Sequence, residues 1–161
     1  MANGSVVIRS SVTWGGALAI AIGAAAAWPD PRGGVPAQDA DPAAPVYEVR
    51  PIGWVRKRDG RTTIEIEPRY RPALLGLEQF ESIWVLYWFD RNDTPEQRSI
   101  LQVHPRANPD NPLRGVFATR APVRPNLIAL SRCRVLSVDG TTIEIDGIDA
   151  FADTPVLDIK P

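Results

Sequence analysis

The sequence predicts an all-β protein, a single compact β-barrel with short helical turns. Three observations favour this fold class. Apolar and polar residues alternate with a period of two in short runs such as TTIEIEP (62–68) and TTIEIDGI (141–148), which is the pattern of strands. Asp-Gly pairs, which favour tight turns, precede both runs. The 161 residues, 44% of them hydrophobic, suffice for one domain with its own core.

The first 46 residues are expected to lie outside the barrel. Residues 17–27 are an uncharged run of Ala, Ile, Leu and Gly, with the length of an export signal's hydrophobic region and too short for a stable membrane span. Small residues then suit cleavage near Ala27 or after Ala37. We divide the chain into a signal-like hydrophobic segment (1–27), a Pro- and Ala-rich linker (28–46) and a barrel domain (47–161).

Two alternatives to export stay open for this N-terminus. It is either an extension from a start codon chosen too far upstream or a disordered Ala-rich tail. The protein is periplasmic or secreted if residues 1–27 are a working signal, and cytoplasmic otherwise.

The first half of the barrel domain is expected to contain three strands. The first is YEVRPIGWVRK (47–57), and the second, at 62–68, ends at Pro68. Residues 69–80 (RYRPALLGLEQF) should form a short helix or helical turn with Pro72 near its start. Residues 82–89 (SIWVLYWF) are aromatic and β-branched, which predicts a central strand buried on both faces.

The second half begins with a long polar connection at 90–114. Connections of this length in a compact domain are usually functional or mobile. Strands are then expected at 115–119 (GVFAT), 126–138 (NLIALSRCRVLSV), 141–148 and 154–161 (TPVLDIKP). The total of six or seven strands with little helix is typical of a compact barrel.

Charge is distributed unevenly, although the formal net charge is −1 and no overall field favours nucleic acid. Residues 98–134 contain seven arginines, no lysine and one acid, Asp110, whereas residues 135–161 contain six acids and one base, Lys160. Arginine without lysine favours bidentate recognition of a carboxylate or a phosphate. The alternative is that the arginines lie on solvated strand edges or form internal ion pairs.

Other reactive residue types give weak indications. Cys133 is the single cysteine, so an internal disulfide is excluded, and its place in an alternating run suggests a buried, inert thiol. His104, the single histidine, is expected at the surface. The sequence has no metal-ligand cluster and no Gly-rich phosphate loop, so no metal is predicted.

Four stretches resemble one known family: IGWVRK (52–57), LEQFESIWVLYWF (77–89), GVFATRAPVRPNLIALS (115–131) and DAFADTPVLDIKP (149–161). They look like the TrmO-like family, also called TsaA-like or YaeB, over about residues 49–161. The resemblance implies a single β-barrel that forms a homodimer, with its cofactor near the subunit interface. It also implies S-adenosylmethionine-dependent methylation of the N6 nitrogen of threonylcarbamoyladenosine in tRNA.

The resemblance further implies a cofactor pocket lined from three places. These are the end of the aromatic strand, the FATR arginine with the leucine after the RPN turn, and the segment before TPVLDIKP. An arginine there can bind the cofactor's carboxylate or a substrate phosphate through two parallel hydrogen bonds, and an aspartate suits its ammonium or a ribose hydroxyl. The residues at these positions are Asp90, Arg91, Arg120, Leu130, Ile148, Asp149, Ala150 and Phe151.

Arg124 and Asn126 are candidates for positioning the reactants. Pro122 and Pro125 restrict the backbone that presents them, so little conformational entropy is left to lose on binding. Methyl transfer from a sulfonium depends on the alignment of the nucleophile, and no general base is assigned. A structural alternative for the two arginines of this stretch is pairing with acids across the barrel, namely Asp149, Asp153 or Asp158.

Some positions depart from the family's pattern. Asp90 stands where the family commonly has histidine. KRDGR (57–61) replaces a Pro-Arg-Gln loop of the cofactor site, so that wall is expected to be shortened or absent. Leu127 and Ala129 change the RPN turn, and Asp153 stands where glycine would allow a tighter turn.

Three functions stay open at this point. The first is an S-adenosylmethionine-dependent methyltransferase acting on tRNA or a small-molecule methyl acceptor. The second is an exported small-molecule-binding barrel without enzyme activity, which the signal-like segment favours. The third is a methyltransferase for a small metabolite that has lost tRNA activity, which the short chain favours.

Overall fold

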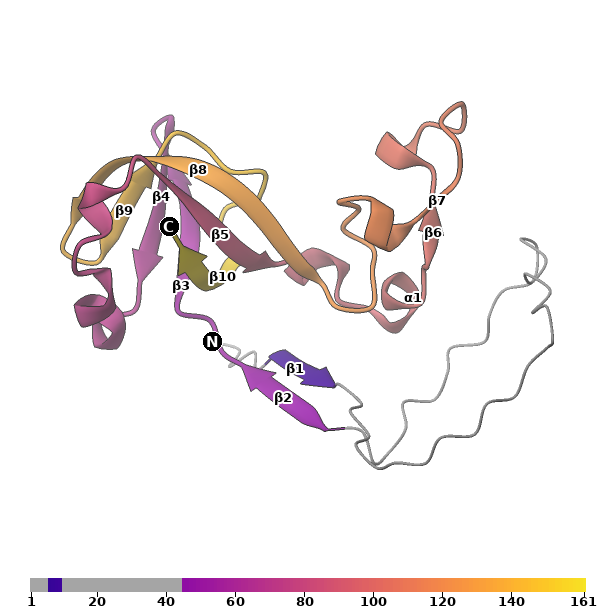
Figure 1. Ribbon diagram of the computed structural model, residues 1–161, viewed down its shortest axis with the longest axis horizontal. Coiled ribbons are helices and arrows are strands. Elements are labelled where there is room, and N and C mark those ends of the chain that lie inside the picture. Colours follow the sequence, from indigo (N-terminus) through magenta and orange to yellow (C-terminus); the bar gives the residue numbers. More distant parts are fainter. Residues whose placement is uncertain (1–5, 10–44) are drawn as a thin grey trace, which may run out of the picture. The chain divides into compact units, whose positions relative to one another are not determined.

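The computed structural model describes residues 6–9 and 45–161 (Figure 1). The predicted signal-like segment (1–27) and linker (28–46) lie outside the described residues, apart from strand β1 (Val6–Arg9) and the start of strand β2 (Val46–Val49). These two strands form a sheet of their own. Residues 49–161 belong to a separate compact unit that contains the barrel.

Six strands close into an antiparallel barrel, so the predicted all-β barrel is confirmed (Figure 1). Their order around the barrel is β10-β3-β4-β9-β8-β5. Closure pairs every strand edge of the barrel with a neighbour. The strands are β3 (Gly53–Arg58), β4 (Arg61–Ile66), β5 (Ser82–Trp88), β8 (Ile128–Asp139), β9 (Thr142–Ile145) and β10 (Pro155–Lys160).

The Asp-Gly pairs form tight turns, as the sequence predicts. Asp59 and Gly60 both have positive φ, 51° and 74°, between the paired residues Arg58 and Arg61. Positive φ at both central residues is the requirement of a type I′ hairpin, whose twist matches that of the strands. Gly140 has φ of 61° in the hairpin that joins β8 to β9.

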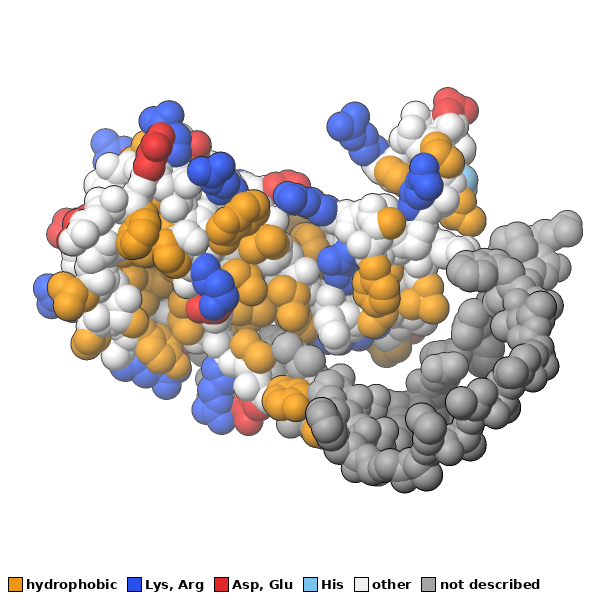
Figure 2. Space-filling view, viewed as in Figure 1, with side chains coloured by type: hydrophobic (Ala, Val, Ile, Leu, Met, Phe, Trp, Pro, Cys, Tyr) orange, Lys and Arg blue, Asp and Glu red, His pale blue; other side chains and the backbone are white. Residues whose placement is uncertain are grey.

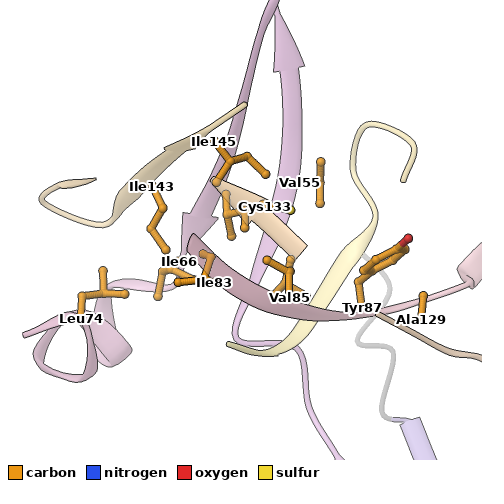
Figure 3. Close-up of a cluster of buried hydrophobic side chains, with 12 residues drawn as sticks. Val55, Ile66, Leu74, Ile83, Val85, Tyr87, Ala129, Cys133, Ile143 and Ile145 are labelled. Atoms are coloured by element: carbon orange, nitrogen blue, oxygen red, sulfur yellow. The ribbon is translucent and has the colours of Figure 1, made fainter. Parts of the chain in front are cut away.

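The core lies inside the barrel and consists of alternate residues from each strand. On β5, Ile83, Val85 and Tyr87 are buried, while the residues between them are partly exposed. The prediction that this strand is buried on both faces is confirmed for the inner face only, because the outer residues Trp84 and Leu86 are partly exposed, although Trp88 at the end of the strand is buried. Figure 3 shows Leu74 at one end of the buried cluster and Tyr87 with Ala129 at the other.

Two predicted strands are interrupted. The run at 47–57 divides into β2, which ends at Val49, and β3, which begins at Gly53. Pro51 lies in the gap, where its missing N–H and fixed φ disfavour a continuous ladder. The run at 115–119 forms a short 3-10 helix, η5 (Val116–Ala118), because only β7 (Arg114–Gly115) pairs, with β6 (Gln102–Val103).

The remaining elements are short helices, as expected for this fold class. The predicted helical stretch at 69–80 contains two 3-10 helices, η1 (Pro68–Leu74) and η2 (Leu77–Gln79). The long connection holds η3 (Asp90–Asn92), α1 (Pro95–Arg98) and η4 (Pro105–Ala107). No helix within the described ranges is both long and apolar enough to cross a bilayer.

The buried thiol of Cys133 should make stability depend on pH in the alkaline range. Burial in the barrel, with a smaller effect of the Asp146 carboxylate, raises the pKa of this thiol from 9.0 to about 11. The unfolded chain therefore loses the proton first, so this contribution to stability is complete below pH 9 and is lost as the pH rises from 9 to about 11. Urea unfolding of wild type and Cys133→Ala from pH 8 to 11 should show a smaller alkaline loss in the variant. Equal pH dependence would contradict the assignment.

Candidate functional site

One end of the barrel contains a cavity of about 370 Å³. This end is where β5 finishes and where β8 and β10 begin, since Trp88 pairs with Ile128 and Tyr87 with Val156. The volume is within the range of about 300–1,000 Å³ that small-molecule sites occupy. Its lining residues are Lys57, Tyr87, Trp88, Phe89, Asp90, Arg91, Asn92, Arg120, Pro122, Asp149, Ala150, Phe151 and Thr154.

A smaller cavity of about 260 Å³ adjoins the first. The two cavities share four lining residues, namely Tyr87, Phe89, Arg120 and Asp149. The smaller one is completed by Arg124 and by 128–131 at the start of β8. One ligand that spans both volumes, or two ligands that meet at the shared wall, would contact Arg120 and Asp149.

The charged side chains of the shared wall have no ion pair with any described residue. Arg120 and Asp149 line both cavities, whereas the other two acids considered as partners of the arginines are already paired: Asp153 with Arg56, and Asp158 with Lys160. The structural alternative, in which Arg120 pairs with one of the acids of the C-terminal segment, is therefore wrong for the described residues. Charges that line a cavity without partners are suited to an oppositely charged ligand.

Arg124 holds its own loop together. Its Nη2 donates to the carbonyl oxygens of Val116, at 2.7 Å, and Thr119, at 2.8 Å. Its Nε is buried and has no hydrogen-bond partner among the described residues. Arg124 lines the smaller cavity, whereas Asn126 is exposed and lines neither cavity.

The other residues expected at the cofactor pocket divide between the two cavities. Asp90, Arg91, Ala150 and Phe151 line the larger cavity. The Arg91 guanidinium stacks over the Phe151 ring at 4.0 Å, which joins η3 to the segment before β10. Leu130 lines the smaller cavity, and Ile148 packs against the core from outside both linings.

Lys57 lines the side of the site where the wall was expected to be shortened or absent. It is the first residue of the KRDGR stretch and lines the larger cavity, and its Nζ donates to the carbonyl oxygen of Ile148 at 3.1 Å. Sequence reasoning missed this residue because a lysine on a strand is usually a solvated side chain. The available signal was its position in the stretch that replaces the family's loop.

Tyr87 was also not predicted as a site residue, because it lies in an apolar run whose pattern indicates the core. It is 3% exposed, and its hydroxyl donates to the backbone carbonyl of Asp149 at 2.5 Å and lies 3.2 Å from the Ser131 hydroxyl. Burial, together with the Asp149 carboxylate, raises the pKa of the phenol. The side chain therefore stays a neutral hydrogen-bond donor at physiological pH.

The segment that follows β5 is fixed close to the larger cavity. Asp93 accepts hydrogen bonds from Arg98 Nε at 2.7 Å and from the indole N–H of Trp88 at 3.1 Å. The Arg98 guanidinium, helped by the Trp88 N–H, holds the pKa of Asp93 below its usual value. Arg98 also donates to the carbonyl of Pro125 at 3.0 Å. These contacts connect the beginning of the long connection to the loop before β8, beside the site.

These features define a class of protein, a small antiparallel barrel with a charged ligand cavity at one end. Residues 48–161 match the family described as the tRNA-methyltransferase O N-terminal domain, and the chain belongs to this family. A probable S-adenosyl-L-methionine-binding protein of Pyrococcus horikoshii is 46% identical over 114 residues, which are 71% of this chain and 81% of that protein. The corresponding protein of Methanocaldococcus jannaschii is 44% identical over 71% of this chain and 91% of its own.

Two further similarities confirm the predicted family. The human tRNA (adenine(37)-N6)-methyltransferase is 44% identical over 89 residues, which are 55% of this chain and 20% of that enzyme. The crystal structure of TrmO from Pseudomonas aeruginosa is similar with a TM-score of 0.54 and 32% identity over 71% of this chain. The present chain covers 55% of that structure's length.

Asp153 adopts a backbone conformation that favours glycine, as the departure from the family's pattern suggests. Its φ is 67°, and its carboxylate pairs with Arg56. Asp153→Gly and Asp153→Ala both remove the ion pair, but only the alanine keeps a Cβ in the left-handed region. We expect the glycine variant to be more stable than the alanine variant by about 1 kcal/mol. Thermal unfolding of the pair measures this difference, and equal melting temperatures would argue against strain.

Proposed function

We propose that this protein is an S-adenosylmethionine-dependent methyltransferase that acts on an adenine N6 nitrogen in tRNA. The observation that carries the proposal is the shared wall of the two cavities, where Arg120 and Asp149 are charged and unpaired. S-adenosylmethionine combines a carboxylate with an ammonium and a sulfonium, so it needs both charges in one site. The names of the relatives support the same cofactor and the same class of acceptor.

The lining residues suit the cofactor. Arg120 would hold its carboxylate by a bidentate contact, and Asp149 its ammonium or a ribose hydroxyl. The stacked pair of Arg91 and Phe151 offers a flat surface for the adenine. When bound, the cofactor supplies an electrophilic methyl group.

The protein's contribution to catalysis is positioning. The loop that carries Arg120 is fixed by Arg124 through its two backbone carbonyl contacts, and a fixed loop keeps the acceptor nitrogen aligned with the methyl group. Arg124 would act in this way from within the loop, at the wall of the smaller cavity. Asn126, being exposed, would contact the acceptor from outside the cavities.

Calorimetry with S-adenosylmethionine tests the proposal. We expect a dissociation constant in the micromolar range, which corresponds to about 8 kcal/mol, and transfer of a labelled methyl group to tRNA that lacks the modification. Absence of binding heat from folded protein would overturn the cofactor assignment. Binding without transfer to tRNA would instead favour the small-molecule-binding barrel or a methyltransferase for a small metabolite.

A homodimer is part of the proposal. Apolar side chains are exposed on the connection that follows α1, among them Leu101, Leu113 and Phe117, the last of which is 85% exposed, and exposed apolar groups of this kind often mark contact surfaces. Figure 2 shows hydrophobic and basic side chains together on the visible surface. Sedimentation should give twice the mass of the chain; a monomer at micromolar concentration would reject the dimer.

Export belongs to the alternative function, the small-molecule-binding barrel, and is proposed on the basis of the uncharged run at 17–27. Mass spectrometry of the secreted or periplasmic fraction should find a mature N-terminus near Trp28 or Gln38. Full-length protein confined to the cytosol would reject export and would leave the methyltransferase proposal untouched.

A further inference from the structure

We infer that Tyr87 is a positioning residue that sets the place of Asp149 in the ligand site. The inference rests on the proposed function, because it gives the aspartate a role toward the cofactor. Tyr87 lies in the stretch 77–89 that carries part of the family resemblance, but it is not among the residues expected to line the cofactor pocket. It is the last interior residue of β5 before the site, and Figure 3 shows its hydroxyl at the end of the ring that points away from the cluster.

Two side chains from different strands hold the segment that carries Asp149. The Tyr87 hydroxyl, from β5, donates to the carbonyl of Asp149 at 2.5 Å, and Lys57 Nζ, from β3, donates to the carbonyl of Ile148 at 3.1 Å. Both contacts use the backbone and leave the Asp149 carboxylate without a hydrogen-bond partner among the described residues. The carboxylate is therefore directed by its backbone and stays available to a ligand.

The Tyr87 contact should dominate this pair. Tyr87 is buried, its ring packs edge to face against Phe89 with centroids 5.7 Å apart, and Ser131 lies at hydrogen-bond distance from the same hydroxyl. Packing of the ring and the second hydroxyl leave Tyr87 little freedom to move, whereas Lys57 is exposed and a solvated ammonium contributes little net energy. A rigid donor on a barrel strand therefore fixes the irregular segment at 148–151.

The test is a double-mutant cycle on cofactor affinity, made in the full-length chain. Tyr87→Phe keeps the ring and removes only the hydroxyl, and we expect it to weaken S-adenosylmethionine binding about 10-fold. Asp149→Asn should weaken binding about 30-fold. If Tyr87 acts through Asp149, the double variant should bind no more than about 2-fold more weakly than Asp149→Asn alone.

Two further variants complete the design. Tyr70→Phe is the matched control, because Tyr70 lies in η1, stacks with Arg69 and lines neither cavity; its affinity should stay within about 2-fold of wild type. Lys57→Gln removes the second tether from an exposed position, so folding is not at risk. We expect Lys57→Gln to weaken S-adenosylmethionine binding about 3-fold, and to have no further effect in the Asp149→Asn background.

Each outcome shows whether Tyr87 acts through Asp149 or independently of it. If the two substitutions act independently, the double variant should bind S-adenosylmethionine about 300-fold more weakly than wild type, and this result would overturn the inference. Unchanged affinity in Tyr87→Phe would overturn it as well. Should Tyr87→Phe fail to fold, the cycle with Lys57→Gln tests the same segment, and a loss of affinity that persists in the Asp149→Asn background would overturn the inference that backbone tethers at 148–149 set the place of Asp149. Absence of binding by the wild type would reject the proposed function itself, and is distinguished from failure of the inference because it precedes any variant.

Discussion

Arg120→Ala should weaken S-adenosylmethionine binding by about 100-fold or more. Arg120 is the one cation common to both cavities and has no acidic partner among the described residues. Removing it would leave the ligand's carboxylate unpaired and partly desolvated, which typically costs about 2–5 kcal/mol. Calorimetry measures the loss, and Arg120→Lys should recover only part of it because an ammonium cannot make the two parallel contacts of a guanidinium.

Arg132→Ala is the matched control for this prediction. Arg132 lies on β8, donates to Ser82 from an exposed position and lines neither cavity. Its removal lowers the net charge equally, so any loss caused by general electrostatics would appear in both variants. Binding by Arg132→Ala should stay within about 2-fold of wild type. Similar losses in the two variants, or normal binding by Arg120→Ala, would contradict a specific role for Arg120.

The barrel was predictable because its determinants are local. Period-two runs and Asp-Gly pairs indicate strands and hairpins without reference to the rest of the chain. The wrong predictions of secondary structure concern segments whose conformation depends on contacts with neighbouring elements. Val116 begins a helical turn, and its carbonyl accepts hydrogen bonds from Thr119 and from Arg124, eight residues further along. The β-branched and aromatic residues of this run do not indicate that its carbonyl groups will bond to these side chains and not to a neighbouring strand.

The site was predictable only in part. The unpaired charges, Arg120 and Asp149, lie together as the family resemblance implies. Nothing in the sequence indicated that Arg124 would donate to backbone carbonyls, because carbonyl acceptors have no signature in side-chain types. Tyr87 could not be separated from the core residues beside it, since its burial and its hydroxyl contact depend on where the segment at 148–151 lies.

Gly53→Ala should destabilise the barrel by about 3 kcal/mol, a large fraction of the stability of a small domain. A Cβ at this position would lie 2.3 Å from the carbonyl oxygen of Glu65 and 2.9 Å from Cα of Ile66, both in the backbone of β4. Backbone atoms of a paired strand cannot rotate away, so β3 would have to move from β4. Gly53 also pairs with Val156 of β10. The contact between β3 and β10 closes the barrel and consists of only two residue pairs.

Gly147→Ala separates this steric effect from the general effect of replacing a glycine. A Cβ at Gly147 meets no atom within 4 Å, and the change should alter stability by less than about 0.5 kcal/mol. Urea unfolding followed by tryptophan fluorescence measures both variants, and an unchanged slope with denaturant would place the loss in the folded state. A stable Gly53→Ala barrel would mean that β3 can shift at little cost. In that case, the close approach of β3 to β4 would not be required to keep β3 paired with β10.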